Sequence, residues 1–266
     1  MTSLKFLGTG GGRFAAILQT RATGGVYLFI EDHSGRPRHF HIDPGPGALV
    51  RMLACGLSPL ETDAILVSHC HPDHYADAEI LIEGMTDGGN KRQGALIASR
   101  SVLEGMGDFG PSVSKYHRAK PAIVKSVSPG DGLDLFGIKV EAVLSAHSDP
   151  SSVGFRFHTP KGIVGYVSDT AFDERIVQAH AQSRVLILPV TRPLGMPIPY
   201  HLTVEDAAKI AGAVKPELAL LTHFGTRVIK DGPPKAAEWI QNKMGVRTVA
   251  AEDGMAVDIG DELRIV

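Results

Sequence analysis

Cysteine is scarce in this sequence of 266 residues, which contains only Cys55 and Cys70. Two cysteines cannot build the disulfide framework of a small secreted protein, so that class of protein is excluded. A single bridge between the two stays open, but nothing in the sequence supports it.

Long hydrophobic runs are missing as well. The longest apolar stretches, Ala64–Val67 and Val185–Val190, are far shorter than the roughly 20 residues of a membrane-spanning helix. The first residues, Met1 to Leu7, run directly into a glycine cluster and lack the apolar stretch of a signal peptide. We therefore expect a cytoplasmic protein without a membrane span.

An excess of charge of either sign is also absent, because the formal net charge is −2. This balance gives no general attraction to nucleic acid or to an anionic membrane. Hydrophobic residues make up 43% of the chain and charged residues 21%, as in ordinary folded proteins. Since no linker, repeat or low-complexity tract divides the chain, we expect residues 1–266 to form a single domain.

Short β-rich runs that end in turn residues recur along the chain, with helix-like segments between several of them. The expected strands are Leu4–Leu7, Gly25–Ile30, His39–Ile42, Ala64–Val67, Leu96–Ala98, Ile138–Val143, Gly154–His158, Gly162–Val167, Val185–Leu188 and Leu218–Leu221. The expected helices are Pro46–Cys55, Thr203–Val214 and Pro233–Met244. This order favours an α/β fold of two sheets covered by helices over one alternating sheet.

Two glycine-containing segments predict turns. Gly8-Thr9-Gly10-Gly11-Gly12 lacks the Lys-Ser/Thr of a phosphate-binding P-loop, and no clear helix follows it. We interpret it as a tight turn, with a backbone contact to an anionic substrate as the alternative. Near the end of the chain, Arg247–Ile259 predicts a closing hairpin around Asp253-Gly254.

Metal-ligand side chains gather in His69-Cys70-His71-Pro72-Asp73-His74, directly after the apolar run Ala64–Val67. One short loop rarely gives a single ion that many ligands, and imidazole with carboxylate suits zinc, iron or manganese. A lone His-x-His would more often be an exposed polar turn. Here three more candidates follow apolar strands: His147, Asp169 and His223. Because catalytic side chains concentrate on loops beyond strand ends, the pattern predicts a metal centre.

These motifs resemble the metallo-β-lactamase superfamily. The resemblance rests on His-x-His-x-Asp-His, then a single His, an Asp in Ser-Asp-Thr, a final His in Leu-Thr-His-Phe-Gly, and the earlier His41-Ile42-Asp43-Pro44-Gly45. It extends over nearly the whole chain, from Phe6 to His223. It implies a four-layered αβ/βα sandwich of two mixed sheets flanked by helices, with the site at one edge between the sheets.

The resemblance also implies how two divalent ions would share the ligands. One ion would be bound by His69, His71 and His147, and the other by Asp73, His74 and His223. Asp169 would bridge the two ions, and Asp43 would support the ligand loop from behind. Zinc is the expected metal, with manganese or iron as alternatives. Each ion would keep an open position for water, as a catalytic site needs.

The last third of the chain is similar to the tRNase Z and phosphodiesterase branch of the superfamily. Tyr200-His201-Leu202-Thr203 precedes the final ligand motif by about twenty residues. In that branch the histidine, here His201, is thought to give a proton to the leaving oxygen. A helix-capping or buried core histidine is the alternative interpretation of His201. The single His147, in place of a Glu, resembles the hydrolases rather than the di-iron reductases of the superfamily.

One departure from that branch concerns the substrate. Only about twenty residues separate His147 from Asp169, which is room for two strands and a turn. The tRNA-processing enzymes usually carry a long arm there, so tRNA is not the expected substrate. Arg192 stands where it could meet a phosphate. The segment Gly84–Lys120 could be a lid over the site or a dimer contact.

These observations favour a binuclear hydrolase of a small phosphodiester, such as a cyclic nucleotide or cyclic ribose phosphate, with Asp73 taking the proton of the attacking water and His201 acting as the acid. The alternatives are a lactone, ester or thioester hydrolase on the same centre, and a metal-dependent nucleotide-binding protein without turnover. A homodimer is expected only because proteins of similar sequence are often dimers.

Overall fold

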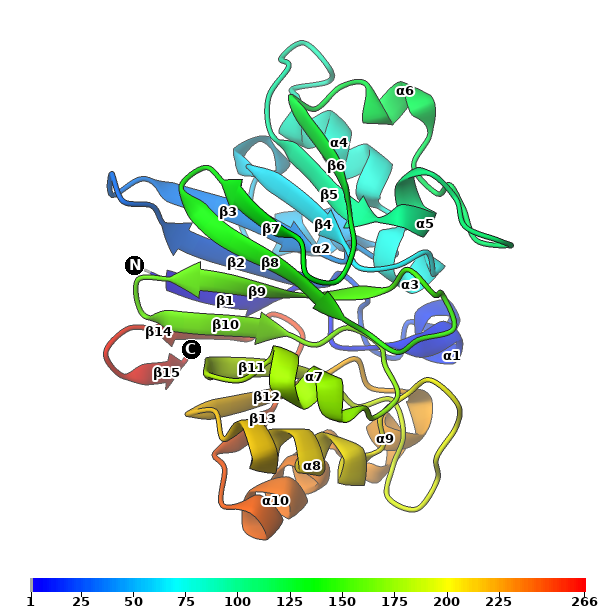
Figure 1. Ribbon diagram of the computed structural model, residues 1–266, viewed down its shortest axis with the longest axis vertical. Coiled ribbons are helices and arrows are strands. Elements are labelled where there is room, and N and C mark those ends of the chain that lie inside the picture. Colours follow the sequence, from blue (N-terminus) through cyan, green and yellow to red (C-terminus); the bar gives the residue numbers. More distant parts are fainter. Residues whose placement is uncertain (1) are drawn as a thin grey trace.

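Two β-sheets lie face to face at the centre of this computed structural model, which describes residues 2–266 (Figure 1). Within those residues the larger sheet has eight strands, in the order β15 (Leu263–Ile265), β14 (Ala256–Ile259), β1 (Thr2–Phe6), β2 (Val26–Glu31), β3 (Pro37–Ile42), β4 (Ala64–Val67), β5 (Ala95–Ser99) and β6 (Ile123–Val127). From β3 to β6 the strands are parallel, and the others pair antiparallel, so the sheet is mixed.

The second sheet is also mixed and has seven strands among the described residues. Their order is β13 (Thr248–Ala250), β12 (Leu218–Thr222), β11 (Ser183–Pro189), β10 (Gly162–Tyr166), β9 (Val153–Thr159), β8 (Ile138–Leu144) and β7 (Gly132–Leu135). The inner faces of the two sheets share one apolar core, in which Phe40 of β3 contacts Phe157 of β9 with ring centroids 5.5 Å apart.

Helices cover the outer face of each sheet. On the eight-stranded sheet these are α2 (Ala48–Ala54), α4 (Ala78–Met85) and α5 (Arg100–Leu103), which bury Met52, Leu81 and Val102. On the seven-stranded sheet they are α7 (Glu174–Ala179), α8 (Val204–Val214), α9 (Thr226–Asp231) and α10 (Pro233–Met244). The four-layered sandwich of two mixed sheets flanked by helices is therefore confirmed.

Two local expectations are wrong. The predicted hairpin does not form, because β13 pairs with β12 in one sheet whereas β14 pairs with β1 in the other. The Asp253 carboxylate fixes this crossing by accepting hydrogen bonds from the backbone N–H groups of Thr9 and Ala22, at 2.8 and 2.7 Å. A helix also opens directly after the glycine cluster: α1 spans Gly12–Leu18.

The segment Gly84–Lys120 is largely part of the sandwich. It contributes the end of α4, then β5, α5 and the short helix α6 (Lys115–Arg118). The His117 ring of α6 lies 3.1 Å from carboxylate oxygens of both Glu79 and Glu83 on α4. In the connection from Glu104 to Ser112 the Phe109 ring lies 5.7 Å from that of His71, one of the metal-ligand residues.

Within residues 2–266, every helix is too short or too polar to cross a membrane. The cytoplasmic location stays a prediction. Both cysteines, Cys55 and Cys70, are free thiols, so the bridge between them does not form.

Candidate metal centre

The ligand-type residues all follow strands whose carboxyl ends meet at one edge of the sandwich. His69, His71, Asp73 and His74 follow β4, and the last two lie in the single helical turn α3 (Pro72–Tyr75). The other members of the cluster follow strands of the second sheet: His147 after β8, Asp169 after β10, His201 after β11 and His223 after β12. The two sheets thus bring residues from distant parts of the chain to one place.

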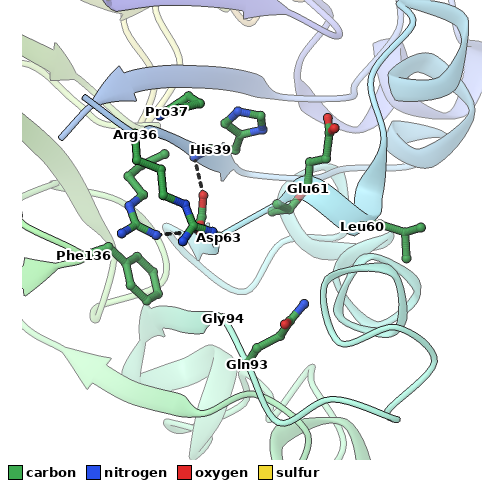
Figure 2. Close-up of a pocket in the computed structure, with 11 residues that line it drawn as sticks. Arg36, Pro37, His39, Leu60, Glu61, Asp63, Gln93, Gly94 and Phe136 are labelled. Carbon is green, nitrogen blue, oxygen red and sulfur yellow. Dashed lines mark hydrogen bonds and ion pairs between the residues drawn. The ribbon is translucent and has the colours of Figure 1, made fainter. Parts of the chain in front are cut away.

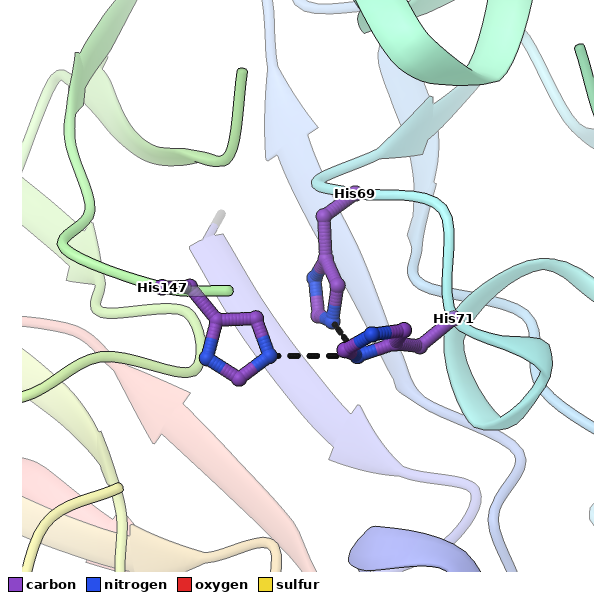
Figure 3. Close-up of side chains that lie close together, drawn as sticks. All are labelled: His69, His71 and His147. Carbon is purple, nitrogen blue, oxygen red and sulfur yellow. Dashed lines mark hydrogen bonds between the residues drawn. The ribbon is translucent and has the colours of Figure 1, made fainter. Parts of the chain in front are cut away.

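Three imidazole rings converge on one point from two sheets (Figure 3). His71 Nδ1 lies 3.0 Å from His69 Nε2 and 3.1 Å from His147 Nε2. A tetrahedral zinc site with Zn–N bonds of about 2.05 Å separates its ligand nitrogens by about 3.3 Å. The spacing of these nitrogens fits a cation at their centre.

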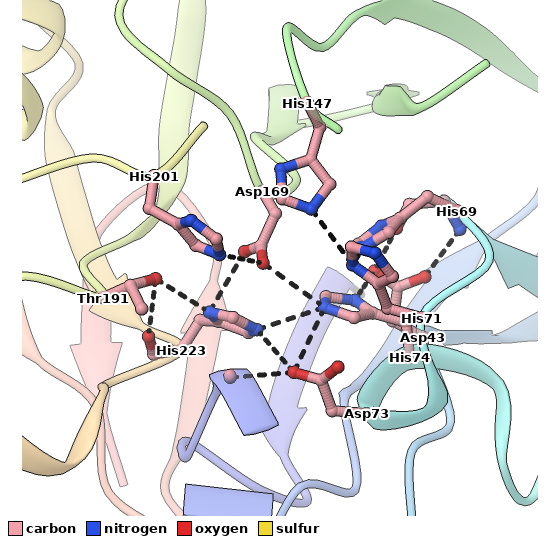
Figure 4. Close-up of polar contacts among 12 residues, drawn as sticks. Asp43, His69, His71, Asp73, His74, His147, Asp169, Thr191, His201 and His223 are labelled. Carbon is pink, nitrogen blue, oxygen red and sulfur yellow. Dashed lines mark hydrogen bonds and ion pairs between the residues drawn. The ribbon is translucent and has the colours of Figure 1, made fainter. Parts of the chain in front are cut away.

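A second group lies beside the first and consists of Asp73, His74 and His223 (Figure 4). The Nε2 atoms of His74 and His223 are 3.1 Å apart, and Asp73 Oδ2 lies 3.7 and 3.3 Å from them. On the other side of the His223 ring, Nδ1 lies 3.2 Å from the Thr191 hydroxyl. Donation from Nδ1 to this hydroxyl leaves the Nε2 lone pair free for a metal.

Asp169 lies between the two groups. One carboxylate oxygen, Oδ2, is 3.7 Å from His74 Nε2, and the other, Oδ1, is 3.0 Å from His223 Nδ1. Among residues 2–266, Oδ1 is buried and has no partner in hydrogen-bond geometry. A buried carboxylate oxygen without a donor is unfavourable unless a cation satisfies it. Asp169 also offers a ligand atom close to those of His69 and His74 on one side and to that of His147 on the other. The position of its carboxylate therefore fits a cation bound between the two groups.

Asp43 supports this cluster from behind. Its carboxylate accepts hydrogen bonds from Ser68 N–H and Ser68 Oγ, both at 2.7 Å, and from Tyr166 Oη at 2.7 Å, and it lies 2.9 Å from His74 Nδ1. Such a contact fixes the tautomer and orientation of the His74 ring. Sequence reasoning missed Ser68 and Tyr166, although each ends or directly follows a strand that leads to the cluster.

Asp149 is a second carboxylate that sequence reasoning missed. It is fully buried and accepts hydrogen bonds from Cys70 N–H and Ser151 N–H, both at 2.9 Å, and from the Ser101 hydroxyl. It thus holds the loop of His69 and His71 against the loop of His147. The only signal was its position two residues after His147, in Ser148-Asp149-Pro150-Ser151.

Burial and neighbouring charges shift the pKa values of the cluster in opposite directions. Burial lowers the pKa of His69 well below its ordinary value and that of His147 to about 4, which favours the neutral, metal-binding imidazole. Burial also opposes ionisation of Asp169, but His223 and His74 outweigh it and hold the pKa of Asp169 well below the usual range. Burial likewise opposes protonation of His74, but the Asp73 and Asp43 carboxylates outweigh it and raise the pKa of His74 well above its ordinary value. The cluster therefore holds ionised carboxylates, two neutral imidazoles (His69 and His147) and, before any metal binds, a protonated His74.

Two residues of the cluster have strained backbone. Asp43 and His223 both adopt left-handed backbone, with φ values of 51° and 55°. For residues other than glycine this conformation costs of order 1–3 kcal/mol. The surrounding hydrogen bonds hold both side chains toward the cluster despite that cost.

His201 faces the cluster from the opposite side to α3. Its Nε2 lies 3.5 Å from Asp169 Oδ2, while Nδ1 lies 3.0 Å from the carbonyl oxygen of Pro199. Thr203 caps α8, and the His201 side chain is 21% exposed. Neither alternative interpretation of His201, a helix cap or a buried core histidine, therefore fits.

Arg192 lies outside the cluster. Its Nε donates a hydrogen bond to the carbonyl oxygen of Met196 at 2.9 Å, and its side chain lines a neighbouring pocket together with His201.

A separate pocket of 470 Å³ lies away from the cluster (Figure 2). Arg36, Arg38, Glu61, Asp63 and Phe136 are among its lining residues. Arg38 is already paired there with Asp32 and Asp63, at 2.8 and 3.3 Å. None of the metal-ligand residues lines this pocket, so the chemistry implied by the cluster does not take place in it.

Comparison with known sequences identifies the family. A sequence model described as the β-lactamase superfamily domain matches residues 38–224. An uncharacterized protein of Methanocaldococcus jannaschii is 39% identical, over 96% of this chain and 94% of its own. A ribonuclease Z of Pyrobaculum neutrophilum is 27% identical, over 85% of this chain and 88% of its own.

Solved structures show the same fold at lower identity. The metallo-β-lactamase fold protein YhfI of Bacillus subtilis superimposes with a TM-score of 0.78 at 18% identity, covering 96% of this chain and 98% of YhfI. A diphosphatase of the PhnP family gives a TM-score of 0.69 at 21% identity, covering 98% of each chain. Together with the His/Asp cluster, these findings show that the chain belongs to the β-lactamase superfamily, as a metal-dependent hydrolase of the metallo-β-lactamase fold.

Proposed function

We propose that this protein is a binuclear metal-dependent phosphodiesterase that acts on a small phosphodiester, such as a cyclic nucleotide or a cyclic ribose phosphate. The observation that carries the proposal is the position of His201, whose Nε2 faces the cluster 3.5 Å from Asp169 Oδ2. Cleavage of a P–O bond to an alkoxide needs an acid at that place, because the leaving oxygen is strongly basic.

Two divalent ions, with zinc as the first candidate, would be held by the residues of the two groups. His69, His71 and His147 would hold one, and Asp73, His74 and His223 the other, with Asp169 between them. Metal ions bound there would supply Lewis acidity and lower the pKa of bound water toward neutrality. The position of the Asp169 carboxylate between the two groups and the close imidazole nitrogens support this assignment.

The chain's own residues then divide the proton transfers between two sides of the cluster. Asp73 accepts the proton of the attacking water, and Gly12 N–H steadies its carboxylate by a 2.8 Å hydrogen bond. On the opposite side, His201 gives a proton from Nε2 to the departing oxygen, while its Nδ1 is held by the Pro199 carbonyl oxygen. An acid and a base on opposite sides suit in-line displacement at phosphorus.

The connection between β9 and β10 supports a small substrate. The two strands follow His147 and precede Asp169, and only Pro160 and Lys161 lie between them. A two-residue turn cannot grip a tRNA, and the net charge of −2 provides no general attraction to it.

The test compares two leaving groups in the wild type and in His201→Ala and His201→Gln. A 2′,3′-cyclic nucleotide releases an alkoxide, whereas bis(p-nitrophenyl) phosphate releases a weakly basic phenolate. We expect kcat to fall by about 10²- to 10⁴-fold for the cyclic nucleotide, the usual contribution of a positioned acid, and much less for the phenolate ester. Metal analysis of each variant is the control. Equal losses on both esters, or turnover of a lactone or carboxylic ester alone, would contradict the proposal.

We also propose that the protein forms a homodimer through α2. Val50 and Leu53 lie three residues apart on this helix and are 68% and 56% exposed, so they form an apolar patch on its outer face. Light scattering should give the mass of two chains, and Leu53→Glu should shift it toward one. A single-chain mass for the wild type at micromolar concentration would refute the dimer.

A further inference from the structure

A pocket of 340 Å³ adjoins the metal-ligand cluster on the side of His201. Its walls come from three segments: the start of α1, the connection from Thr191 to His201, and Gly225-Thr226. Gly10 and Phe224 pair as a β-bridge, which holds the start of α1 beside that last segment. His201 therefore belongs both to the cluster and to the lining of this pocket. A group attached to the oxygen that His201 protonates would extend toward the pocket.

Two large apolar side chains that line this pocket are exposed. Phe14 is 61% exposed and Ile198 is 38% exposed, and they approach the pocket from different walls. Single exposed apolar residues are common on protein surfaces and need no explanation. Phe14 and Ile198, however, both line one pocket beside the proposed acid, His201. The aromatic ring of Phe14 offers a flat surface on which another ring could stack.

The pocket is also positively charged, although the chain carries a net charge of −2. Arg13 and Arg192 line it, and none of its lining residues is an aspartate or a glutamate. The Arg13 guanidinium has no hydrogen-bond or ion-pair partner among residues 2–266. Arg192 uses its Nε for the Met196 carbonyl oxygen, which leaves its terminal nitrogens available. Planar guanidinium groups of this kind match phosphate oxygens.

We infer that this pocket binds the nucleoside part of the substrate, with the base stacked on Phe14 and flanked by Ile198, and with Arg13 and Arg192 near phosphate or ribose oxygens. The inference rests on the proposed function and narrows its substrate class. It predicts that the protein prefers nucleotides to cyclic ribose phosphates that lack a base. In the reaction, water adds its oxygen to phosphorus and the P–O bond to the ribose breaks. His201 gives that ribose oxygen its proton, while one proton of the water passes to Asp73 and the other stays on the new phosphate oxygen.

The first experiment measures kcat/KM for a 2′,3′-cyclic nucleotide and for a cyclic ribose phosphate without a base. The ratio of the two values should favour the nucleotide in the wild type and fall about tenfold in Phe14→Ala, mainly through KM, because stacking of one base contributes this much or more. Phe14→Trp should keep the ratio and Phe14→Leu should lose it. Ile17→Ala, an exposed apolar residue of the same helix outside the pocket, is the matched control. An unchanged ratio in Phe14→Ala would overturn the inference.

A second experiment does not depend on turnover. Calorimetry of metal-loaded protein should show adenosine monophosphate binding about tenfold tighter than ribose 5-phosphate, and Phe14→Ala should remove the difference. Nucleotide preference without cleavage of any diester would leave the subsite intact and contradict the proposed function alone. Equal affinity for the two ligands in the wild type would refute the subsite, whatever the activity.

Discussion

At the scale of single residues, Gly11 shows how closely the chain approaches its own cluster. A Cβ atom at this position would lie 2.1 Å from Cγ of the His223 ring, far inside contact distance. The backbone of Gly11 is held there by a hydrogen bond from its N–H to the Phe224 carbonyl oxygen at 3.1 Å. The glycine cluster is thus a tight turn, as the sequence suggested. The missing side chain at Gly11 also leaves the space that the His223 ring occupies.

Gly11→Ala should therefore displace His223 and weaken one of the two proposed metal sites. We expect the affinity for the second ion to fall by about 10- to 100-fold, the usual effect of disturbing a ligand's support. Metal titration followed by elemental analysis measures it. Gly132→Ala, where an added Cβ meets nothing within 4 Å, is the control. Wild-type binding of both ions by Gly11→Ala would contradict this role.

At the scale of elements, apolar runs were predictable and weakly patterned segments were not. Each expected strand overlaps an observed one, because buried runs such as Ala64–Val67 carry a strong signal. The edge strand β6 was missed since three of its five residues are exposed. Helix α1 was missed because Ala15 is its one buried residue, so it has no apolar face for the core. The prediction of a hairpin at the end of the chain was wrong because β13 and β14 pair with strands that are distant in sequence, and such pairing leaves no local sequence pattern.

The residues at the start of α8 lie next to His201, so the cap of this helix also fixes part of the candidate site. Thr203 and Asp206 form a reciprocal capping box, and Thr203 also pairs with Arg192 as a β-bridge, two residues after His201. Thr203→Ala should lower the free energy of unfolding by about 1 kcal/mol, as loss of an N-cap usually does. Urea unfolding measures this change, with Asn242→Ala on the exposed face of α10 for comparison. If both variants unfold at the wild-type urea concentration, the cap does not stabilise the helix.

At the scale of the whole molecule, the predicted ligands meet because two sheets share one core and end at one edge. Sequence motifs were sufficient to name residues such as His69 and Asp169, since each follows an apolar strand. They were not sufficient to name Tyr166 or Asp149, whose contacts with Asp43 and Cys70 exist only after the sheets pack. The pocket beside His201 was equally unpredictable, because it joins three segments that are distant in sequence.

Burial of histidine in the sandwich makes stability depend on pH. Burial lowers the pKa of His180 to about 3 and that of His41 to about 4. Below the ordinary value of about 6.5, the unfolded chain binds protons at these positions and the folded chain does not. Their stabilising effect is therefore complete above pH 6.5 and is lost as the pH falls toward 4 and 3.

His180→Gln should reduce this acid sensitivity. Each such histidine contributes a slope of about 1.4 kcal/mol per pH unit in the window between its two pKa values. Urea unfolding at several pH values between 6 and 4 should give a slope shallower by about that amount in the variant. Parallel slopes for the variant and the wild type would show that His180 is not the group that titrates on unfolding.

The most direct test of the central claim is a zinc titration of metal-free protein, with bound metal and hydrolysis of bis(p-nitrophenyl) phosphate measured in the same samples. The account predicts that hydrolysis is absent without metal and reaches its plateau at two bound ions per chain. A fully loaded protein that leaves the diester intact, or a plateau at one ion, would contradict it.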